Sequence, residues 1–200
     1  MNAGASIYGQ SPATALHRDA SGWRVQTAQG ASVRTERVVL CTNGYTGALW
    51  PGLARSVITP NSFQVATEPL SEAVAQTILP QGHVSSDTRQ LLLYFRLDHQ
   101  RRLIMGGRGP FREPSSSADW AHLERVIGRM FPAAANAPIA YRWCGRVAIT
   151  RDFLPHLHEP EPGLLINIGC MGRGIPLHRF RQIYLSAIIA WYRMNDGGLA

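Results

Sequence analysis

Short apolar runs, separated by glycine, proline and polar residues, recur along the whole chain and predict strands more often than helices. The run at residues 38–41 is continuously apolar, as expected for a strand buried on both faces, and it ends at the turn signal Thr42-Asn43-Gly44. The same reasoning predicts further strands at residues 23–27, 31–34, 57–67 with an interruption at Pro60, 91–97, 102–107, 140–150 and 164–168.

Three segments have the spacing of helices. Ser71 is predicted to cap a short helix at residues 72–78. Ser117 is predicted to cap a longer helix at residues 118–131, where apolar side chains recur every three or four positions. A third helix is predicted at residues 178–194. Strands therefore dominate, and the pattern predicts an α+β fold with a mixed, largely antiparallel sheet and flanking helices.

The composition fits one ordinary domain with a real core, because 45% of the 200 residues are hydrophobic. No apolar run approaches the length of roughly 20 residues needed to span a bilayer, so no membrane span is predicted. The three cysteines, Cys41, Cys144 and Cys170, lie far apart and lack the CxxC spacing. This spacing argues against a disulfide framework or a zinc site, and it makes a reducing cytoplasm the expected location.

The formal net charge is +7, and all 20 basic residues are arginine. Chemistry that needs a lysine, such as a Schiff base, is therefore excluded. The arginines are scattered in ones and twos, whereas a nucleic-acid-binding surface usually shows clustered arginines or interleaved aromatic residues, so no nucleic-acid partner is predicted. His156 and His158 have the spacing of two metal ligands on a strand. The prolines Pro155, Pro160 and Pro162 indicate a surface loop instead, so no metal is predicted there.

The most informative pattern is a predicted strand at residues 164–168 that enters a glycine-rich turn at residues 169–174 and then a helix. Such a turn presents backbone N–H groups to an anion or a polarised carbonyl. Its spacing is G-x-x-G-x-G, not the G-x-G-x-x-G of a dinucleotide fingerprint, and no acidic residue about 20 positions on completes that unit. Taken alone, the turn is equally well explained as a tight connection between a strand and a helix.

A second dense stretch, at residues 141–155, places two arginines and Trp143 near Asp152. Such a set can bind a carboxylate or line a planar ring. The alternative is a strand with an exposed charged face and a structural tryptophan, which the composition alone favours. The glycine-rich segment at residues 105–109 lacks a strand-to-helix context and predicts a strand end at which backbones pack closely.

Nine short motifs, taken in chain order, resemble one family. They lie at residues 6–9, 38–45, 50–53, 66–70, 94–96, 105–109, 143–145, 150–155 and 172–174. Each motif is weak by itself, but the ordered set is similar to the D-amino-acid-oxidase-like FAD-dependent oxidoreductases and covers nearly the whole chain. Within that family, the resemblance is strongest to the branch that contains gamma-glutamylputrescine oxidoreductase.

The resemblance implies a flavoprotein that oxidises a C–N bond of a small amine or amino acid, by hydride transfer to N5 of FAD and hydrolysis of the resulting imine. It also implies a division of the chain into three parts. These are the late part of a Rossmann-like FAD domain at residues 1–50, a substrate-binding domain at residues 51–145, and a return to the FAD domain with a tail helix at residues 146–200.

By the same resemblance, two groups of residues form the site, and no general base is identified. The expected contacts to the flavin ring are Trp143, Gly145, Asp152, Gly169, Cys170, Met171, Gly172, Arg173 and Gly174. The expected substrate-binding residues are Tyr94, Arg96 and Met105. For Arg96, a surface salt bridge is an equally good interpretation.

Two departures from the family pattern change the expectation. Family members open with a strand, a G-x-G-x-x-G turn and a helix that grip the FAD diphosphate. This sequence contains no such segment, so we expect weak FAD binding by this chain alone. The alternative function is therefore a non-catalytic remnant, or an interaction subunit that pairs with a separate FAD-binding chain. The chain also passes directly from Gly174 to Ile175, where the family continues with a small-residue helix, which suggests an internal deletion.

The position of one arginine bears on the substrate. Where many amino-acid oxidases of the family carry an arginine for the substrate carboxylate, this chain has Val147, and Arg146 lies one residue earlier. A shift by one position on a strand turns a side chain to the opposite face. The resemblance therefore favours an amine over a simple amino acid as the substrate.

Overall fold

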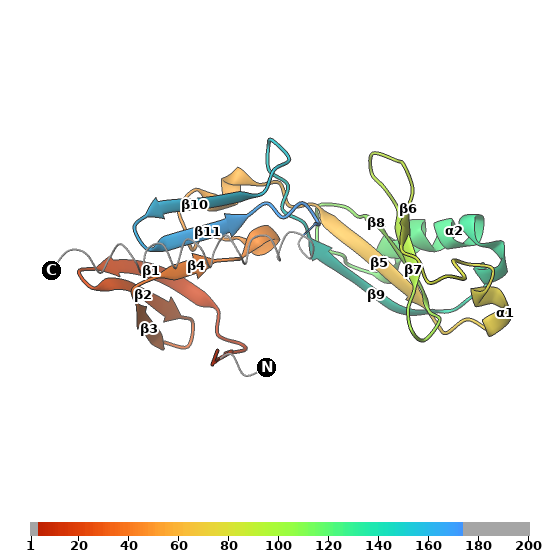
Figure 1. Ribbon diagram of the computed structural model, residues 1–200, viewed down its shortest axis with the longest axis horizontal. Coiled ribbons are helices and arrows are strands. Elements are labelled where there is room, and N and C mark those ends of the chain that lie inside the picture. Colours follow the sequence, from red (N-terminus) through yellow and green to blue (C-terminus); the bar gives the residue numbers. More distant parts are fainter. Residues whose placement is uncertain (1–3, 174–200) are drawn as a thin grey trace. The chain divides into compact units, whose positions relative to one another are not determined.

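The computed structural model describes residues 4–173 of the 200-residue chain and has two compact units (Figure 1). Unit 1 comprises residues 1–58 and 148–200, and unit 2 comprises residues 59–147. The sequence placed these divisions at 50/51 and 145/146. The predicted helix at residues 178–194, and Gly174 with the suggested deletion after it, lie outside the described residues. Strands outnumber helices in the described part of both units, which confirms the α+β prediction.

Unit 1 begins with an antiparallel meander in the order β1-β2-β3. Its strands are β1 (Ala13–Asp19), β2 (Gly22–Thr27) and β3 (Ser32–Thr35). The turn between β1 and β2 requires a glycine, because Gly22 has φ +135° and a Cβ there would lie 2.6 Å from the carbonyl oxygen of Thr35. The sequence did not predict β1, in which burial does not alternate strictly from residue to residue.

The second sheet of unit 1 joins two distant parts of the chain. Its order is β10 (His156–Glu161), β11 (Leu164–Ile168) and β4 (Val38–Leu40), with β10 antiparallel and β4 parallel to β11. Every residue of β11 is buried, including the polar Asn167, whereas β4, predicted to be buried on both faces, leaves Val39 exposed. Because β4 and β11 are parallel, their carboxyl ends meet at the same edge of the sheet. The short 3-10 helix η1 (Asn43–Tyr45) follows β4 at that edge, and η2 (Leu53–Ser56) comes next in the chain.

The prediction of a surface loop around the two histidines was wrong, because His156–Glu161 form β10. β10 lies at the edge of its sheet, and its register with β11 shifts between His158 and Glu161. Pro160 lies in this irregular part of an edge strand, where a residue without an N–H group is tolerated. The prolines therefore mark an edge strand, not a loop.

Unit 2 is built on one antiparallel sheet in the order β6-β7-β8-β5-β9. Its strands are β5 (Asn61–Thr67), β6 (Ser85–Ser86), β7 (Tyr94–Leu97), β8 (Leu103–Arg108) and β9 (Ile139–Arg146). Its helices are α1 (Glu72–Ala75), η3 (Ser117–Trp120), α2 (Ala121–Met130) and η4 (Pro132–Ala134). Ser71 caps α1 as predicted. Ser116, not the predicted Ser117, starts the longer helical segment, because Asp119 completes a capping box with it. In residues 4–173, no helix has the length and apolar character needed to cross a membrane.

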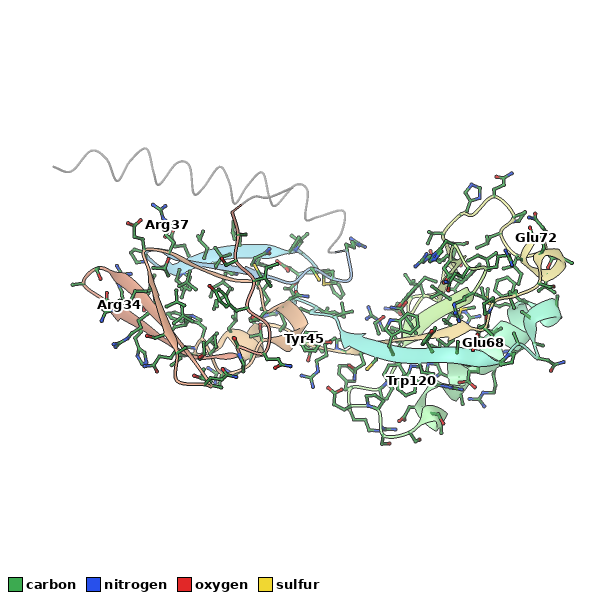
Figure 2. All side chains as sticks on the ribbon, turned by 90° about the horizontal axis from the view of Figure 1, so that it is seen from below. Arg34, Arg37, Tyr45, Glu68, Glu72 and Trp120 are labelled. Atoms are coloured by element: carbon green, nitrogen blue, oxygen red, sulfur yellow. The ribbon has the colours of Figure 1, made fainter. Side chains whose placement is uncertain are left out.

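The two faces of this sheet differ, because side chains alternate along each strand. One face is covered by α2 and the turn before it (Figures 1 and 2), and its core contains Phe63, Met105, Trp120 and Leu123. We call the opposite side the open sheet face. Cross-strand pairing aligns two rows of residues on it: Tyr94, Gly106, Gln64 and Trp143, and next to them Arg96, Ile104, Ala66 and Tyr141.

Candidate functional site

The glycine-rich turn follows β11 directly and depends on left-handed backbone conformations. Gly169, Met171 and Gly172 have φ values of 77°, 55° and 75°. Gly169 is buried, and a Cβ there would lie 2.5 Å from Cγ2 of Thr150 and 3.2 Å from the carbonyl oxygen of Leu154. A residue with a side chain at position 169 would therefore meet both backbone strain and a close contact. Gly172 and Arg173 are exposed, and Cys170 and Met171 are half-buried.

Most of the turn's backbone donors are used inside the chain. The amide of Cys170 donates to Oδ1 of Asn43 (3.2 Å), that of Met171 to the carbonyl of Ala148 (3.2 Å), and that of Arg173 to the carbonyl of Cys170 (2.8 Å). The resemblance implied that the amides of this turn face the flavin ring, while the turn taken alone was equally well explained as a tight connection. Within residues 4–173, the exposed amide of Gly172 has no acceptor, so it is the donor that the turn can offer to a bound group.

Asn43 holds this turn in place, and the sequence did not identify it as a site residue. Its Nδ2 donates to Sγ of Cys170 (2.9 Å) while its Oδ1 accepts from the amide of the same residue (3.2 Å). Asn43 itself has φ 46°, a conformation that asparagine tolerates better than most residues. It is the first residue of η1, which ends at Tyr45, the residue labelled in Figure 2. The Thr-Asn-Gly turn signal after the apolar run at residues 38–41 was the clue in the sequence, but the partner, Cys170 after β11, could not be identified from it.

Asn43→Ala is expected to lower the free energy of unfolding of unit 1 by about 1–3 kcal/mol. The variant loses both side-chain hydrogen bonds to Cys170, and alanine fits the left-handed backbone less well. Hydrogen exchange of the Cys170 amide measures the effect directly, because that amide loses its acceptor. Asn43→Asp keeps an acceptor oxygen for the amide and should protect it partly. Unchanged exchange in Asn43→Ala would show that the clamp does not hold the turn.

Asp152 stabilises the turn between residues 150 and 156 through its side chain. Thr150 Oγ1 donates to the carbonyl of Leu154 (2.6 Å), the Leu154 amide donates to Oδ1 of Asp152 (3.1 Å), and His156 Nε2 lies 2.9 Å from the same oxygen. The hydrogen bond to His156, followed by that from the Leu154 amide, lowers the pKa of Asp152 to about 2. The aspartate of this motif is therefore a carboxylate whose Oδ1 accepts hydrogen bonds within unit 1.

Asp152→Asn is expected to remove part of the acid sensitivity of unit 1. The folded pKa of Asp152, about 2, lies below its ordinary value of 3.8, so the carboxylate stabilises the fold above pH 3.8 and loses this contribution as the pH falls through about 2. Thermal unfolding of both proteins across this window measures the effect. The wild-type chain should lose more stability than the variant on acidification. Parallel pH profiles would contradict the assignment.

The two histidines of β10 stack on each other, with ring centroids 5.2 Å apart and an angle of 15° between the rings. His156 is already hydrogen-bonded to Asp152. Across residues 4–173, no three histidine, cysteine or acidic side chains gather in a way that could hold a metal ion.

In unit 2, four of the predicted residues share the open sheet face. Tyr94 lies across Gly106, where a Cβ would come within 2.0 Å of its ring, and its hydroxyl is hydrogen-bonded to Oγ of Ser62. Arg96 is exposed and has no acidic partner among the described residues, so the salt-bridge interpretation finds no support. Trp143 is 38% exposed, and Gly145 pairs with Ser62 on the same face.

Met105 does not belong with these residues, and its prediction as a substrate contact needs correction. It is 0% exposed and packs in the core on the α2 side of the sheet. The reason is that side chains alternate between the two faces along a strand. Met105 pairs with Val65 and Phe95 on the α2 side, whereas the residues before and after each of them face the open side.

Arg146 lies on the face opposite to Gly145, as expected for a residue one position before Val147, where the family carries its arginine. Its Nε donates to Oε1 of Glu113 (3.0 Å), and Glu113 also accepts from its Nη2. This ion pair occupies the guanidinium that would otherwise be available to a substrate carboxylate.

A sequence model of one family, described as DAO, FAD dependent oxidoreductase, matches residues 1–179. The chain is 31% identical over 182 residues to the probable oxidoreductase OrdL of Haemophilus influenzae. It is 28% identical over 158 residues to the gamma-glutamylputrescine oxidoreductase of Escherichia coli. These alignments cover 88% and 76% of this chain but 41% and 35% of the relatives, so the chain spans about two fifths of the length of the curated relatives it matches.

Solved structures with the same fold include two glycine oxidases. That of Bacillus cereus has a TM-score of 0.75 at 19% identity. The matched region covers 94% of this chain and 52% of the Bacillus cereus chain. That of Geobacillus kaustophilus has a TM-score of 0.66 at 22% identity, with coverage of 86% and 46%. At these identities the likeness concerns the fold alone. The family match and the relatives confirm the resemblance that the nine motifs indicated.

Proposed function

The chain belongs to the DAO family of FAD dependent oxidoreductases, and on this premise we propose that it forms the substrate-side part of an enzyme that oxidises a C–N bond of an amine. The observation that carries the proposal is the open sheet face of unit 2. It combines the exposed indole of Trp143, the tyrosine Tyr94 and the unpaired guanidinium of Arg96 on one side of a rigid sheet.

Unit 1 would contribute to flavin binding through its glycine-rich turn. The exposed amide of Gly172 is a donor of the kind that a flavin carbonyl oxygen accepts, and the clamp from Asn43 fixes the backbone around it. When bound, FAD supplies the acceptor for a hydride from the carbon next to the substrate nitrogen. Gly169 to Arg173 are the proposed turn contacts of this chain, and Asp152 stabilises the adjacent loop. Of the other residues that the resemblance implied, Trp143 and Gly145 lie on the open sheet face of unit 2.

The open sheet face suits a cationic substrate. The guanidinium of Arg102 lies 5.0 Å from the ring centroid of Tyr141 and covers that ring, so the indole of Trp143 is the π-face offered to an ammonium group. Arg96 adds an unpaired positive charge, which favours a substrate with a carboxylate at a distance from its amine. We therefore propose an amine that carries a remote carboxylate, which is also the chemistry in the name of the Escherichia coli relative, a gamma-glutamylputrescine oxidoreductase.

The test uses the purified chain with added FAD and a matched pair of amines, γ-glutamylputrescine and putrescine, which differ by the carboxylate-bearing group. Anaerobic loss of the visible flavin absorbance measures oxidation of the amine. Arg96→Gln is expected to raise KM for γ-glutamylputrescine at least about tenfold and to leave KM for putrescine unchanged, because a charge-assisted hydrogen bond is lost with the first substrate alone.

Arg101→Gln is the matched control, because Arg101 is an exposed arginine of the same unit that pairs with Glu72 at 3.6 Å. It should leave KM for both amines unchanged. FAD is added in large excess because weak binding is expected, and failure of either amine to reduce it under these conditions would contradict the proposed function. An equal effect of Arg96→Gln on both amines would contradict the role given to the remote carboxylate.

A further inference from the structure

A groove of about 740 Å³ lies within unit 2 and shares no residue with the rows of the open sheet face. Four arginines line it, Arg89, Arg108, Arg125 and Arg129, around an apolar floor that includes Leu91 and Val126. We call it the arginine groove. Its volume is in the range of sites for small organic ligands.

The walls of the groove come from three separate segments. Arg125 and Arg129 lie one turn apart on α2, on the same side of the helix as Val126. The loop before β7 forms another wall, where Oδ1 of Asp87 accepts from the amides of Arg89 (3.3 Å) and Leu93 (2.9 Å). These hydrogen bonds fix the loop that carries Arg89 and Leu91.

The third wall is the end of β8, which carries Arg108. His122 on α2 ties this strand end to the helix, because its Nε2 lies 3.1 Å from the carbonyl oxygen of Arg108 and its Nδ1 lies 3.1 Å from that of Asp119. Hydrogen bonds therefore fix the backbone on two sides of the groove, at the loop before β7 and between β8 and α2. These bonds do not involve the arginine side chains.

The charges in unit 2 are distributed unevenly. Residues 59–147 contain ten arginines and seven acidic residues, and six of the acids form ion pairs with six of the arginines. Within this fully described range, the arginines without an acidic partner are Arg96, Arg108, Arg125 and Arg129, and three of these four line the groove.

The fourth groove arginine, Arg89, has an acidic neighbour in Asp87. Oδ2 of Asp87 lies 3.0 Å from Nε of Arg89, but this oxygen makes no hydrogen bond, so the pair is an ion pair by distance alone. The terminal nitrogens of Arg89 can therefore turn toward a ligand. Like charges one helical turn apart, as at Arg125 and Arg129, repel each other, and an anion between them removes this repulsion.

We propose that the arginine groove binds a small organic anion with at least two negative charges, carried by phosphate or carboxylate groups on an apolar body. Guanidinium groups match phosphate and carboxylate oxygens with two parallel hydrogen bonds. The apolar floor formed by Leu91, Leu93 and Val126 would cover the body of the ligand. This site is independent of the proposed oxidation and of flavin binding.

The test is calorimetric titration of the full chain with two probes at low salt. ATP represents a phosphate head on a planar body, and sebacate represents carboxylates on an aliphatic body. Saturable binding of one probe is expected, and it identifies the anionic group. The double variant R125Q/R129Q should weaken that binding by at least about tenfold, since charge-assisted hydrogen bonds are lost. Both arginines are exposed, so thermal unfolding should be unchanged.

The double variant R55Q/R151Q is the matched control, because it removes the same charge from two exposed arginines of unit 1. It should leave the affinity unchanged. Absence of saturable binding of either probe would overturn the proposal, and so would an equal loss in the two double variants. Inorganic triphosphate that binds as tightly as ATP would overturn the role given to the apolar floor.

Discussion

Phe63→Ala is expected to lower the free energy of unfolding of unit 2 by about 3–5 kcal/mol. Phe63 is 0% exposed and stacks on Trp120, with 4.7 Å between the ring centroids. It also packs against the backbone of Gly109, where a Cβ would lie 2.3 Å from the ring. Removing the ring leaves a cavity between the sheet and the α2 segment that the surrounding backbone cannot fill.

Urea denaturation, with hydrogen exchange of the β5 amides to report on unit 2, measures this loss. Phe111→Ala is the matched control, because Phe111 lies in the same unit and is 68% exposed, so its removal should change stability by less than about 0.5 kcal/mol. Similar losses in the two variants would show that Phe63 is not a centre of the core. The strand that carries Phe63 on its core side also carries residues of the open sheet face. Loss of the core packing at Phe63 would therefore also disturb that face.

Gly169→Ala is expected to lower the free energy of unfolding of unit 1 by about 2–5 kcal/mol. An L-residue in the left-handed conformation costs about 1–2 kcal/mol, and an added methyl group in a packed interior costs about 1–3 kcal/mol. Both apply here, because Gly169 has φ +77° and its Cβ would lie 2.5 Å from Cγ2 of Thr150. Relief of the contact would displace the turn, so the variant should also lose any FAD binding of the chain.

Gly30→Ala separates the two causes. Gly30 lies in the same unit with φ +82°, and a Cβ there would meet nothing within 4 Å. This variant should show the backbone cost alone, about 1–2 kcal/mol, and retain any FAD binding. Thermal unfolding and equilibrium dialysis with FAD measure both properties. Equal stability losses in the two variants would show that the contact with Thr150 is relieved without cost.

Local patterns in the sequence determined much of the fold. The apolar runs located β4 and β11, because runs of branched apolar residues favour strands. Burial on both faces, which the run at residues 38–41 predicted, was wrong for β4, because Val39 is 39% exposed there. Ser71 marked the start of α1, because the capping hydrogen bond joins residues three apart in the chain. The nine motifs identified the family, which the match of the family model to residues 1–179 confirms. The edge strand β10 was misread, because proline excludes a residue from a central strand but not from an edge.

The functional residues depended on contacts between distant segments. Strand parity placed Arg96 on the open sheet face and buried Met105, and parity is set by cross-strand register, which no single segment specifies. Asn43 meets Cys170 across 127 residues because β4 and β11 are parallel neighbours. The arginines of the groove are scattered along the sequence, and folding brings them together while their neighbours pair with acids. Sequence therefore determined the elements, whose causes are local, and the tertiary structure determined the sites, because charge and side-chain direction act through space.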